Sequence, residues 1–148
     1  KPDLSQFAID NLFRKCKQLM ESTISNNIEI NTSVYPEDMA LVADYAQVEQ
    51  VLINLIKNAV AAISKKKNGV IQLKAFHGEE GTIIQVEDNG IGISDDIIED
   101  IFVPFYTTKK NGSGIGLSLS KQIMQNHNGT ISVNSAPNKG ATFTLKFQ

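Results

Sequence analysis

The sequence predicts a single α+β domain in which about three helices cover one face of a mixed, mostly antiparallel sheet. Three observations lead to this two-layer α/β sandwich. Three segments repeat apolar residues with a helical period, several others alternate apolar and polar residues, and short turns join consecutive strands. Because short turns join antiparallel strands, while parallel neighbours need long crossovers, a fully parallel sheet is excluded.

The composition is that of an ordinary globular domain. The chain has 148 residues, 41% of them hydrophobic and 20% charged, and a net charge of −2, so neither nucleic acid nor an anionic membrane is an expected partner. No apolar run is long enough to span a bilayer, and no signal-peptide pattern is present. Cys16 is the only cysteine, which excludes an internal disulfide, and we expect it to be buried in a helix. Since the chain begins at Lys1, we expect residues 1–148 to be one domain of a longer protein.

The first two helices are predicted from their apolar stripes. Ser5–Met20 forms the first, with Asp3 or Ser5 as its cap. The second begins at Asp44, and Gln47 follows at capping-box spacing. The residues expected to be buried are Ile9, Leu12, Phe13, Cys16, Leu19 and Met20 in the first helix, and Val48, Val51, Leu52, Leu55, Ala59, Ala62 and Ile63 in the second.

Strands and turns account for most of the remaining chain. A short helical piece is expected from Asp95 to about Phe102, and a third full helix follows Gly116, with Ile115, Leu119 and Ile123 on its core face. Asn128-Gly129 is expected to end that helix with a left-handed residue. The predicted strands are Ile28–Val34, Leu41–Val42, Val70–Phe76, Thr82–Asp88, Thr130–Ser135 and Ala141–Phe147.

Asp88 ends a predicted strand and is the first candidate site residue. Ile84, Val86 and Asp88 share one strand face, so a carboxylate points toward the core, where it needs a hydrogen-bond donor. Gly90 and Gly92 follow and allow a tight turn and a close approach to a ligand. An ordinary strand end with a turn is the alternative interpretation.

Asn54 and Asn58 stand four residues apart, on one side of the second helix and at the edge of its apolar stripe. Asparagine favours helices poorly and is costly to bury unpaired. The two amides either bond to neighbouring loops or line a polar cavity and offer oxygens to a hard cation such as Mg²⁺.

Two further segments indicate a ligand site. Val103–Lys109 is apolar, aromatic and broken by Pro104, so it can act as a lid. Gly112-Ser113-Gly114-Ile115-Gly116 precedes a helix, where exposed backbone N–H groups form a ready phosphate site.

The order of these motifs resembles the ATP-binding catalytic domain of sensor histidine kinases, in the superfamily shared with DNA gyrase B, MutL and the heat-shock-90 chaperones. The resemblance covers essentially the whole chain. The four stretches that carry it are Asn54–Ala59 (N box), Asp88–Gly92 (first glycine box), Phe102–Lys109 (F box) and Gly112–Leu117 (second glycine box).

The resemblance implies a role for each candidate residue. Asp88 would accept a hydrogen bond from the adenine amine, Asn58 would bind the Mg²⁺ that bridges the ATP phosphates, and Asn54 would assist as a second catalytic and metal-binding residue. Gly90 and Gly92 would shape the adenine pocket. The other nucleotide-binding residues would be Phe102 and Phe105 as lid anchors, Lys109, Gly112, Gly114, Gly116 and Leu117 on the phosphate side, and Thr142 on the adenine side.

The implied function is transfer of the γ-phosphoryl group of Mg-ATP to a histidine on a helical hairpin outside this chain, in two-component signalling. His77 and His127 do not look like acceptors. Further partners would be a response regulator and, through the hairpin, a second copy of the whole protein; the domain alone would be monomeric and would form the cytosolic part of a sensor, without membrane contact. The alternatives are a gyrase-like ATPase, a serine/threonine anti-sigma kinase and a non-catalytic nucleotide sensor.

Two departures from the family pattern bear on these alternatives. Asn54 stands where gyrase-like ATPases carry the glutamate that activates water, which argues against efficient hydrolysis. Many histidine kinases carry a basic residue one turn after the metal asparagine, where this chain has Ala61 and Ala62.

Overall fold

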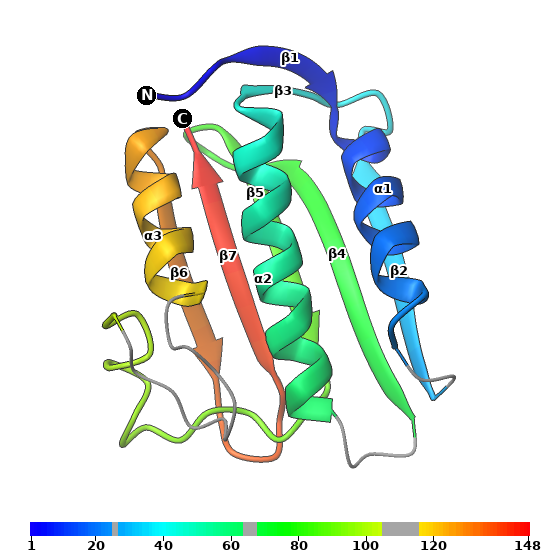
Figure 1. Cartoon of the computed structure of the whole chain (residues 1–148), viewed down its shortest axis with the longest axis vertical. Coiled ribbons are helices and arrows are strands. Elements are labelled where there is room, and N and C mark those ends of the chain that lie inside the picture. Colours follow the sequence, from blue (N-terminus) through cyan, green and yellow to red (C-terminus); the bar gives the residue numbers. More distant parts are fainter. Residues whose placement is uncertain (25–26, 64–67, 105–115) are drawn as a thin grey trace.

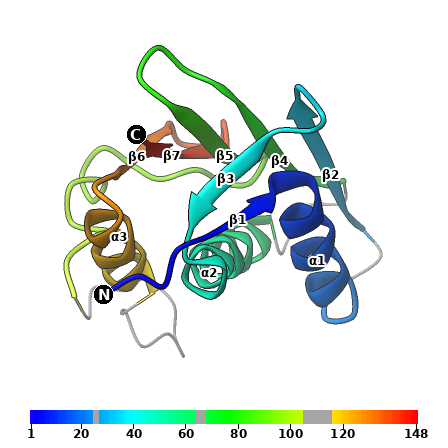
Figure 2. The same cartoon turned by 90° about the horizontal axis from the view of Figure 1, so that it is seen from above.

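The computed structural model describes residues 1–24, 27–63, 68–104 and 116–148, and it confirms the two-layer α+β sandwich. Three helices lie on one face of the larger sheet, and the other face of that sheet carries none of the described helices (Figures 1 and 2). The elements in chain order are β1 (Ser5–Ala8), α1 (Ile9–Glu21), β2 (Ile28–Tyr35), β3 (Ala40–Ala43), α2 (Tyr45–Ile63), β4 (Gly69–His77), β5 (Thr82–Asp88), α3 (Gly116–Asn126), β6 (Thr130–Ser135) and β7 (Ala141–Phe147).

The larger sheet is mixed, as predicted. Its five strands have the order β2-β4-β5-β7-β6. Only β2 and β4 pair in parallel, across the crossover that contains α2, and the other three pairs are antiparallel. In the register of β5 and β7, Asp88 stands opposite Ala141 and Glu87 opposite Thr142. One strand face therefore points toward the helices, and the other, which we call the open face, points away.

The core lies between the helices and the sheet. The predicted stripes of α1 and α2 are buried, with three differences: Leu19 is 47% exposed, Ala62 is only partly buried, and Ile56 belongs to the core. In α3 the predicted face is confirmed at Ile123, which is buried, and wrong at Leu119, which is 42% exposed; Ser120 and Met124 are fully buried instead. Ile115 lies outside the described residues. Ser120 can be buried because its hydroxyl donates to the Gly116 carbonyl. Within the described ranges, no helix combines the length and apolar character needed to cross a bilayer.

The N-terminal segment differs from its prediction. Ser5–Ala8 is a strand, paired antiparallel with β3 in a separate two-stranded sheet, and the helix begins only at Ile9. Neither Asp3 nor Ser5 caps α1, because its cap residue is Ala8 and no side chain bonds the helix start. The Asp3 N–H instead donates to the Asp44 carboxylate at 2.9 Å.

Residues 95–102 form turns where a short helix was expected. The Ile97 N–H bonds to the Ser94 carbonyl and the Asp100 N–H to the Ile97 carbonyl, so each turn closes over three residues. This segment leads from β5 toward residues 105–115, which lie outside the described residues.

The start of α2 confirms Asp44 as its cap. The Gln47 N–H donates to Asp44 Oδ1 at 3.1 Å, which is the first of the two bonds of a capping box; the reciprocal bond from the Asp44 N–H to the Gln47 side chain is not formed. The N–H of Asp44 itself donates to His127 Nε2 at 3.0 Å, and His127 Nδ1 bonds the Ile123 carbonyl at 2.9 Å. His127 thus joins the start of α2 to the end of α3, where Asn128 is left-handed as predicted (φ 58°), and serves a structural purpose.

Cys16 is buried in α1, as expected. It is 0% exposed, and burial, followed by the nearby Glu49 carboxylate, raises the pKa of its thiol to about 12.

We expect a thiol reagent at pH 8 to label native Cys16 roughly 100-fold or more slowly than the urea-unfolded chain, because the thiolate is the reactive form. Since the unfolded thiol ionises near 9.0, stability should also decline as the pH rises from 9 toward 12. Equal labelling rates in the two states would contradict this burial.

Candidate nucleotide site

The site is built around Asp88 at the end of β5. Alternation along β5 buries Ile84, Val86 and Asp88 on the helix side, and Asp88 is one of two buried polar residues in the described part of the chain, with 7% exposure. Its Oδ1 accepts a hydrogen bond from the Gly90 N–H at 2.8 Å. A buried carboxylate of this kind favours a ligand that supplies a further donor.

Close packing fixes the main chain after Asp88. A Cβ atom on Gly90 would lie 2.7 Å from the Ala62 main chain, so α2 presses directly against the turn. The Ile91 N–H donates to the Ala62 carbonyl at 3.1 Å. Gly92 has φ +75°, and a Cβ there would lie 2.0 Å from the Ala136 carbonyl oxygen. The two glycines therefore allow an approach that no side chain permits.

The turn between β6 and β7 also holds the main chain that follows Asp88. Ser135 Oγ accepts the Ile93 N–H and donates to the Gly140 carbonyl, each at 2.8 Å, and the Asn138 N–H donates to the Ile91 carbonyl at 2.6 Å. Ser135 was not among the sequence candidates, because a serine at a strand end carries no signal that separates it from an ordinary turn residue.

Asn54 and Asn58 lie on the side of α2 that the sequence indicates, and both are partly buried. Asn54 Oδ1 accepts from Gln50 at 3.1 Å, and its Nδ2 donates to the Gly116 carbonyl at 3.3 Å. Asn54 therefore links α2 to the first residue of α3. Asn58 lies one helical turn after Asn54 and one turn before Ala62, whose main chain packs against Gly90.

The first residue of α3, Gly116, lies beside Asn54 of α2. A Cβ on Gly116 would meet the Asn54 side chain no closer than 3.8 Å, so this glycine is not required by packing in the described residues. Leu117 packs against the core. A helix N-terminus carries a partial positive charge, which suits a phosphate on this side of the site.

Phe102 is the one described aromatic residue of the predicted lid. Its ring packs edge-on against Phe143 in β7, with centroids 6.4 Å apart, which agrees with an anchoring role. Phe105, Lys109, Gly112 and Gly114 lie outside the described residues.

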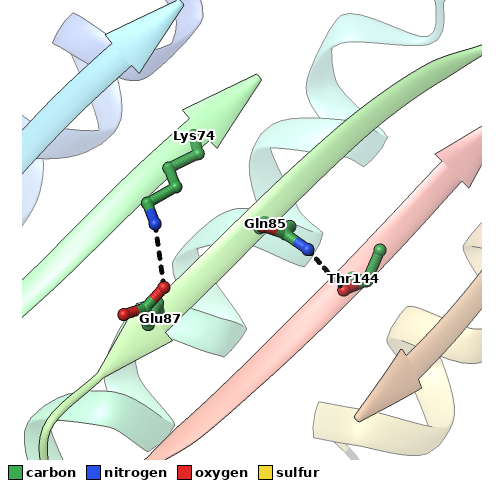
Figure 3. A network of polar contacts seen from close by, with 4 residues as sticks. All are labelled: Lys74, Gln85, Glu87 and Thr144. Atoms are coloured by element: carbon green, nitrogen blue, oxygen red, sulfur yellow. Dashed lines mark hydrogen bonds and ion pairs between the residues drawn. The ribbon is translucent and has the colours of Figure 1, made fainter. Parts of the chain in front are cut away.

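Thr142 is not brought to the Asp88 carboxylate. Asp88 and Thr142 both border a hollow of about 280 Å³ at this end of the sheet, but strand alternation turns Thr142 to the open face with Glu87, whereas Asp88 is buried on the helix side. The residue directly opposite Asp88 is Ala141. Figure 3 shows the neighbouring polar contacts of the strands, the Lys74–Glu87 ion pair at 3.0 Å and the Gln85–Thr144 hydrogen bond.

The packing also bears on Ala61 and Ala62. The carbonyl group and the Cβ atom of Ala62 lie against the Gly90 turn. A long basic side chain therefore has little room at position 62. Ala61 is exposed and lies away from this contact.

Comparison with known proteins agrees with this geometry. The model of the family described as histidine kinase-, DNA gyrase B-, and HSP90-like ATPase matches residues 43–148, which include α2, Asp88 and α3. The chain therefore belongs to this family of ATP-binding domains.

Within the family, its relatives are sensor histidine kinases. The chain is 37% identical over 131 residues to the C4-dicarboxylate transport sensor protein DctB of Rhizobium meliloti (strain 1021), covering 88% of this chain and 21% of that protein. It is 46% identical over 103 residues to the sensor histidine kinase ZraS of Escherichia coli O157:H7, covering 70% and 22%. The chain thus spans about a fifth of the length of these curated relatives.

Solved structures place the fold among histidine kinase catalytic domains. The nucleotide-free catalytic domain of histidine kinase ThkA superposes with a TM-score of 0.86 at 32% identity and covers 98% of this chain and 95% of its own. Full-length ShkA in complex with AMPPNP gives 0.87 at 26%, covering 99% and 31%. ThkA in complex with the response regulator protein TrrA gives 0.81 at 28%, covering 99% and 42%. The chain is a catalytic domain of the histidine kinase type.

Proposed function

We propose that this domain binds the adenine of Mg-ATP through the Asp88 carboxylate and donates the γ-phosphoryl group to a histidine on a helical hairpin outside this chain. The observation that carries the proposal is the buried carboxylate at the end of β5, which faces α2 and is held by the Gly90 N–H at 2.8 Å. An exocyclic amine is the kind of donor such a group requires. Family membership supports ATP as the nucleotide.

The phosphate side is assigned to the start of α3, which meets α2 at Asn54, about two helical turns before the contact between Ala62 and Gly90. Gly116 and Leu117 begin α3 beside Asn54, and we propose that they hold the phosphates with Gly112, Gly114 and Lys109. Phe102 would anchor the lid on Phe143, with Phe105 as a second anchor. Phosphoryl transfer depends mainly on positioning and charge neutralisation, which these groups supply.

The amide side chains of α2 fit a magnesium ion. Mg²⁺ takes oxygen ligands and keeps several waters. Among the described residues, no cluster of three or more His, Cys, Asp or Glu could hold a metal, so the ion would bind to few protein ligands together with the ATP phosphates. We propose Asn58 as the main ligand and Asn54 as a second one, as the resemblance of Asn54–Ala59 to the N box implies. When bound, the ion neutralises phosphate charge.

Replacing Asn58 by alanine should remove the benefit of magnesium. We expect the unmutated domain to bind ATP about tenfold more tightly in Mg²⁺ than in EDTA, and Asn58→Ala to bind equally in both, because one ligand of the ion is lost. Titration with ATP under the two conditions measures this. Lys57→Ala, at the exposed neighbouring position, is the control and should keep the difference. If the unmutated domain showed no magnesium dependence, the metal role would be excluded.

The partners follow from the same proposal. The hairpin would carry the acceptor histidine and the dimer contacts of the whole protein, so this domain alone would be monomeric. The complex of ThkA with a response regulator supports a response regulator as the next acceptor of the phosphoryl group. The domain would then lie on the cytosolic side of a sensor.

Phosphorylation of the hairpin tests the function directly. The domain is mixed with the hairpin segment of its own protein and ATP labelled at the γ-phosphate. We expect label on the hairpin that is lost in acid and kept in alkali, as for phosphohistidine. Acid-stable label would indicate a serine/threonine kinase, free phosphate without labelled hairpin an ATPase, and nucleotide binding without either a sensor. Asn54 has no ionisable group, which disfavours the ATPase.

A further inference from the structure

Asn89, the residue between Asp88 and Gly90, connects the strand end to β4 through its side chain. Its Oδ1 accepts the Val70 N–H at 2.8 Å, and its Nδ2 donates to the Asn68 carbonyl at 2.9 Å. The Asn89 N–H donates to the Val70 carbonyl at 3.3 Å. Three hydrogen bonds therefore join this one residue to the beginning of β4.

The side chain of Asn89 takes the place of a main-chain hydrogen-bond partner between β4 and β5. The register of β4 and β5 ends with Ile71 opposite Asp88, so the next pair would be Val70 with Asn89. In a regular antiparallel pair the Val70 N–H would donate to the main-chain carbonyl of Asn89. Here the side-chain carbonyl takes that bond, which releases the main-chain carbonyl of Asn89 from the ladder while the Val70 N–H keeps an acceptor.

The release is what allows Asp88 to close its turn. Directly after Asn89, the chain leaves the strand and packs Gly90 against Ala62, and the Gly90 N–H reaches Asp88 Oδ1. Without the Asn89 side chain, either the Val70 N–H loses its acceptor or the main chain of Asn89 is drawn back into the ladder. In both cases the attachment to β4 of the turn that orients the Asp88 carboxylate is changed.

We propose that Asn89 is a positioning residue for adenine recognition, which orients Asp88 by taking the place of a main-chain ladder partner. The proposal rests on the proposed function of Asp88 and extends it to a side chain that does not touch the nucleotide. A residue with this role affects selection of the base amine, whereas a residue that only stabilises the fold affects all nucleotides alike.

The test therefore compares two nucleotides that differ only in that amine. ATP and purine riboside 5′-triphosphate, which lacks the exocyclic amine, are titrated into the domain and into Asn89→Ala at a temperature well below the unfolding midpoint of each. We expect Asn89→Ala to bind ATP about tenfold more weakly and the analogue almost unchanged, because only the aligned hydrogen bond to Asp88 is lost. Asn31→Ala, which removes an exposed asparagine bonded to Glu29, should keep the full preference for ATP.

The outcomes separate this inference from the proposed function. Equal binding of the two nucleotides to the unmutated domain overturns the adenine role of Asp88 itself. A clear preference for ATP in the unmutated domain, combined with an equal loss for both nucleotides in Asn89→Ala, overturns only the positioning role. Where Asn89→Ala is unfolded at the working temperature, Asn89→Asp, which keeps an acceptor for the Val70 N–H, should retain the preference for ATP, and loss of that preference in a folded Asn89→Asp domain overturns the positioning role.

Discussion

Replacing Asp88 by asparagine should abolish measurable ATP binding, with a loss of about 100-fold or more in affinity, or about 3 kcal/mol. Asparagine has nearly the shape of aspartate and can still accept the Gly90 N–H that Asp88 Oδ1 accepts at 2.8 Å. The N–H group of the asparagine amide then faces the N–H group of the adenine amine, so two donors meet. Because the site is buried, water cannot relieve this mismatch. Titration calorimetry with ATP measures the loss, and thermal unfolding without nucleotide should change little.

Glu87 provides the matched control for this change. It precedes Asp88 in β5, carries the same functional group, and points to the open face, where it pairs with Lys74 at 3.0 Å (Figure 3). Glu87→Gln removes one negative charge next to the site but leaves the helix side untouched, so ATP affinity should stay within about twofold, as for exposed ion pairs. If Asp88→Asn retained the affinity of this control, the base would bind elsewhere.

Much of the fold and the central site residue follow from strand alternation. The buried face of β5 places Ile84, Val86 and Asp88 together, and a period of two leaves no other face for them. The glycines after Asp88 are also predictable, since a turn beside a helix allows no Cβ. Local pattern was sufficient in these cases because the side chains that decide the structure are neighbours in sequence.

The errors arise where distant segments decide the structure. Ser5–Ala8 is a strand only because it pairs with Ala40–Ala43, and its own four residues favour neither state. In α3 the helical period allows a face with Leu119 or one with Ser120, and the packing of the helix against α2 and β6 decides between them; Ser120 can be buried because its hydroxyl donates to the Gly116 carbonyl.

Replacing Gly140 by alanine should have the largest effect on stability. Gly140 has φ +76°, and a Cβ there would lie 2.0 Å from the carbonyl oxygen of Asp88. A left-handed alanine is strained, and the contact is with main chain that cannot rotate away, so we expect a loss of about 2–4 kcal/mol in the free energy of unfolding. Urea unfolding of the nucleotide-free domain measures it.

Gly116 offers the comparison that separates close packing from helix propensity. Its Cβ would meet only the Asn54 side chain, at 3.8 Å, and its φ lies outside the left-handed region. Gly116→Ala should therefore unfold at the same urea concentration or a higher one, with a gain of at most about 1 kcal/mol because alanine favours a helix. The relief of the Gly140 clash requires Asp88 itself to shift, so any Gly140→Ala protein that still folds should also bind ATP more weakly. A Gly140→Ala domain as stable as Gly116→Ala would show that the turn after β6 does not press on the strand that carries Asp88.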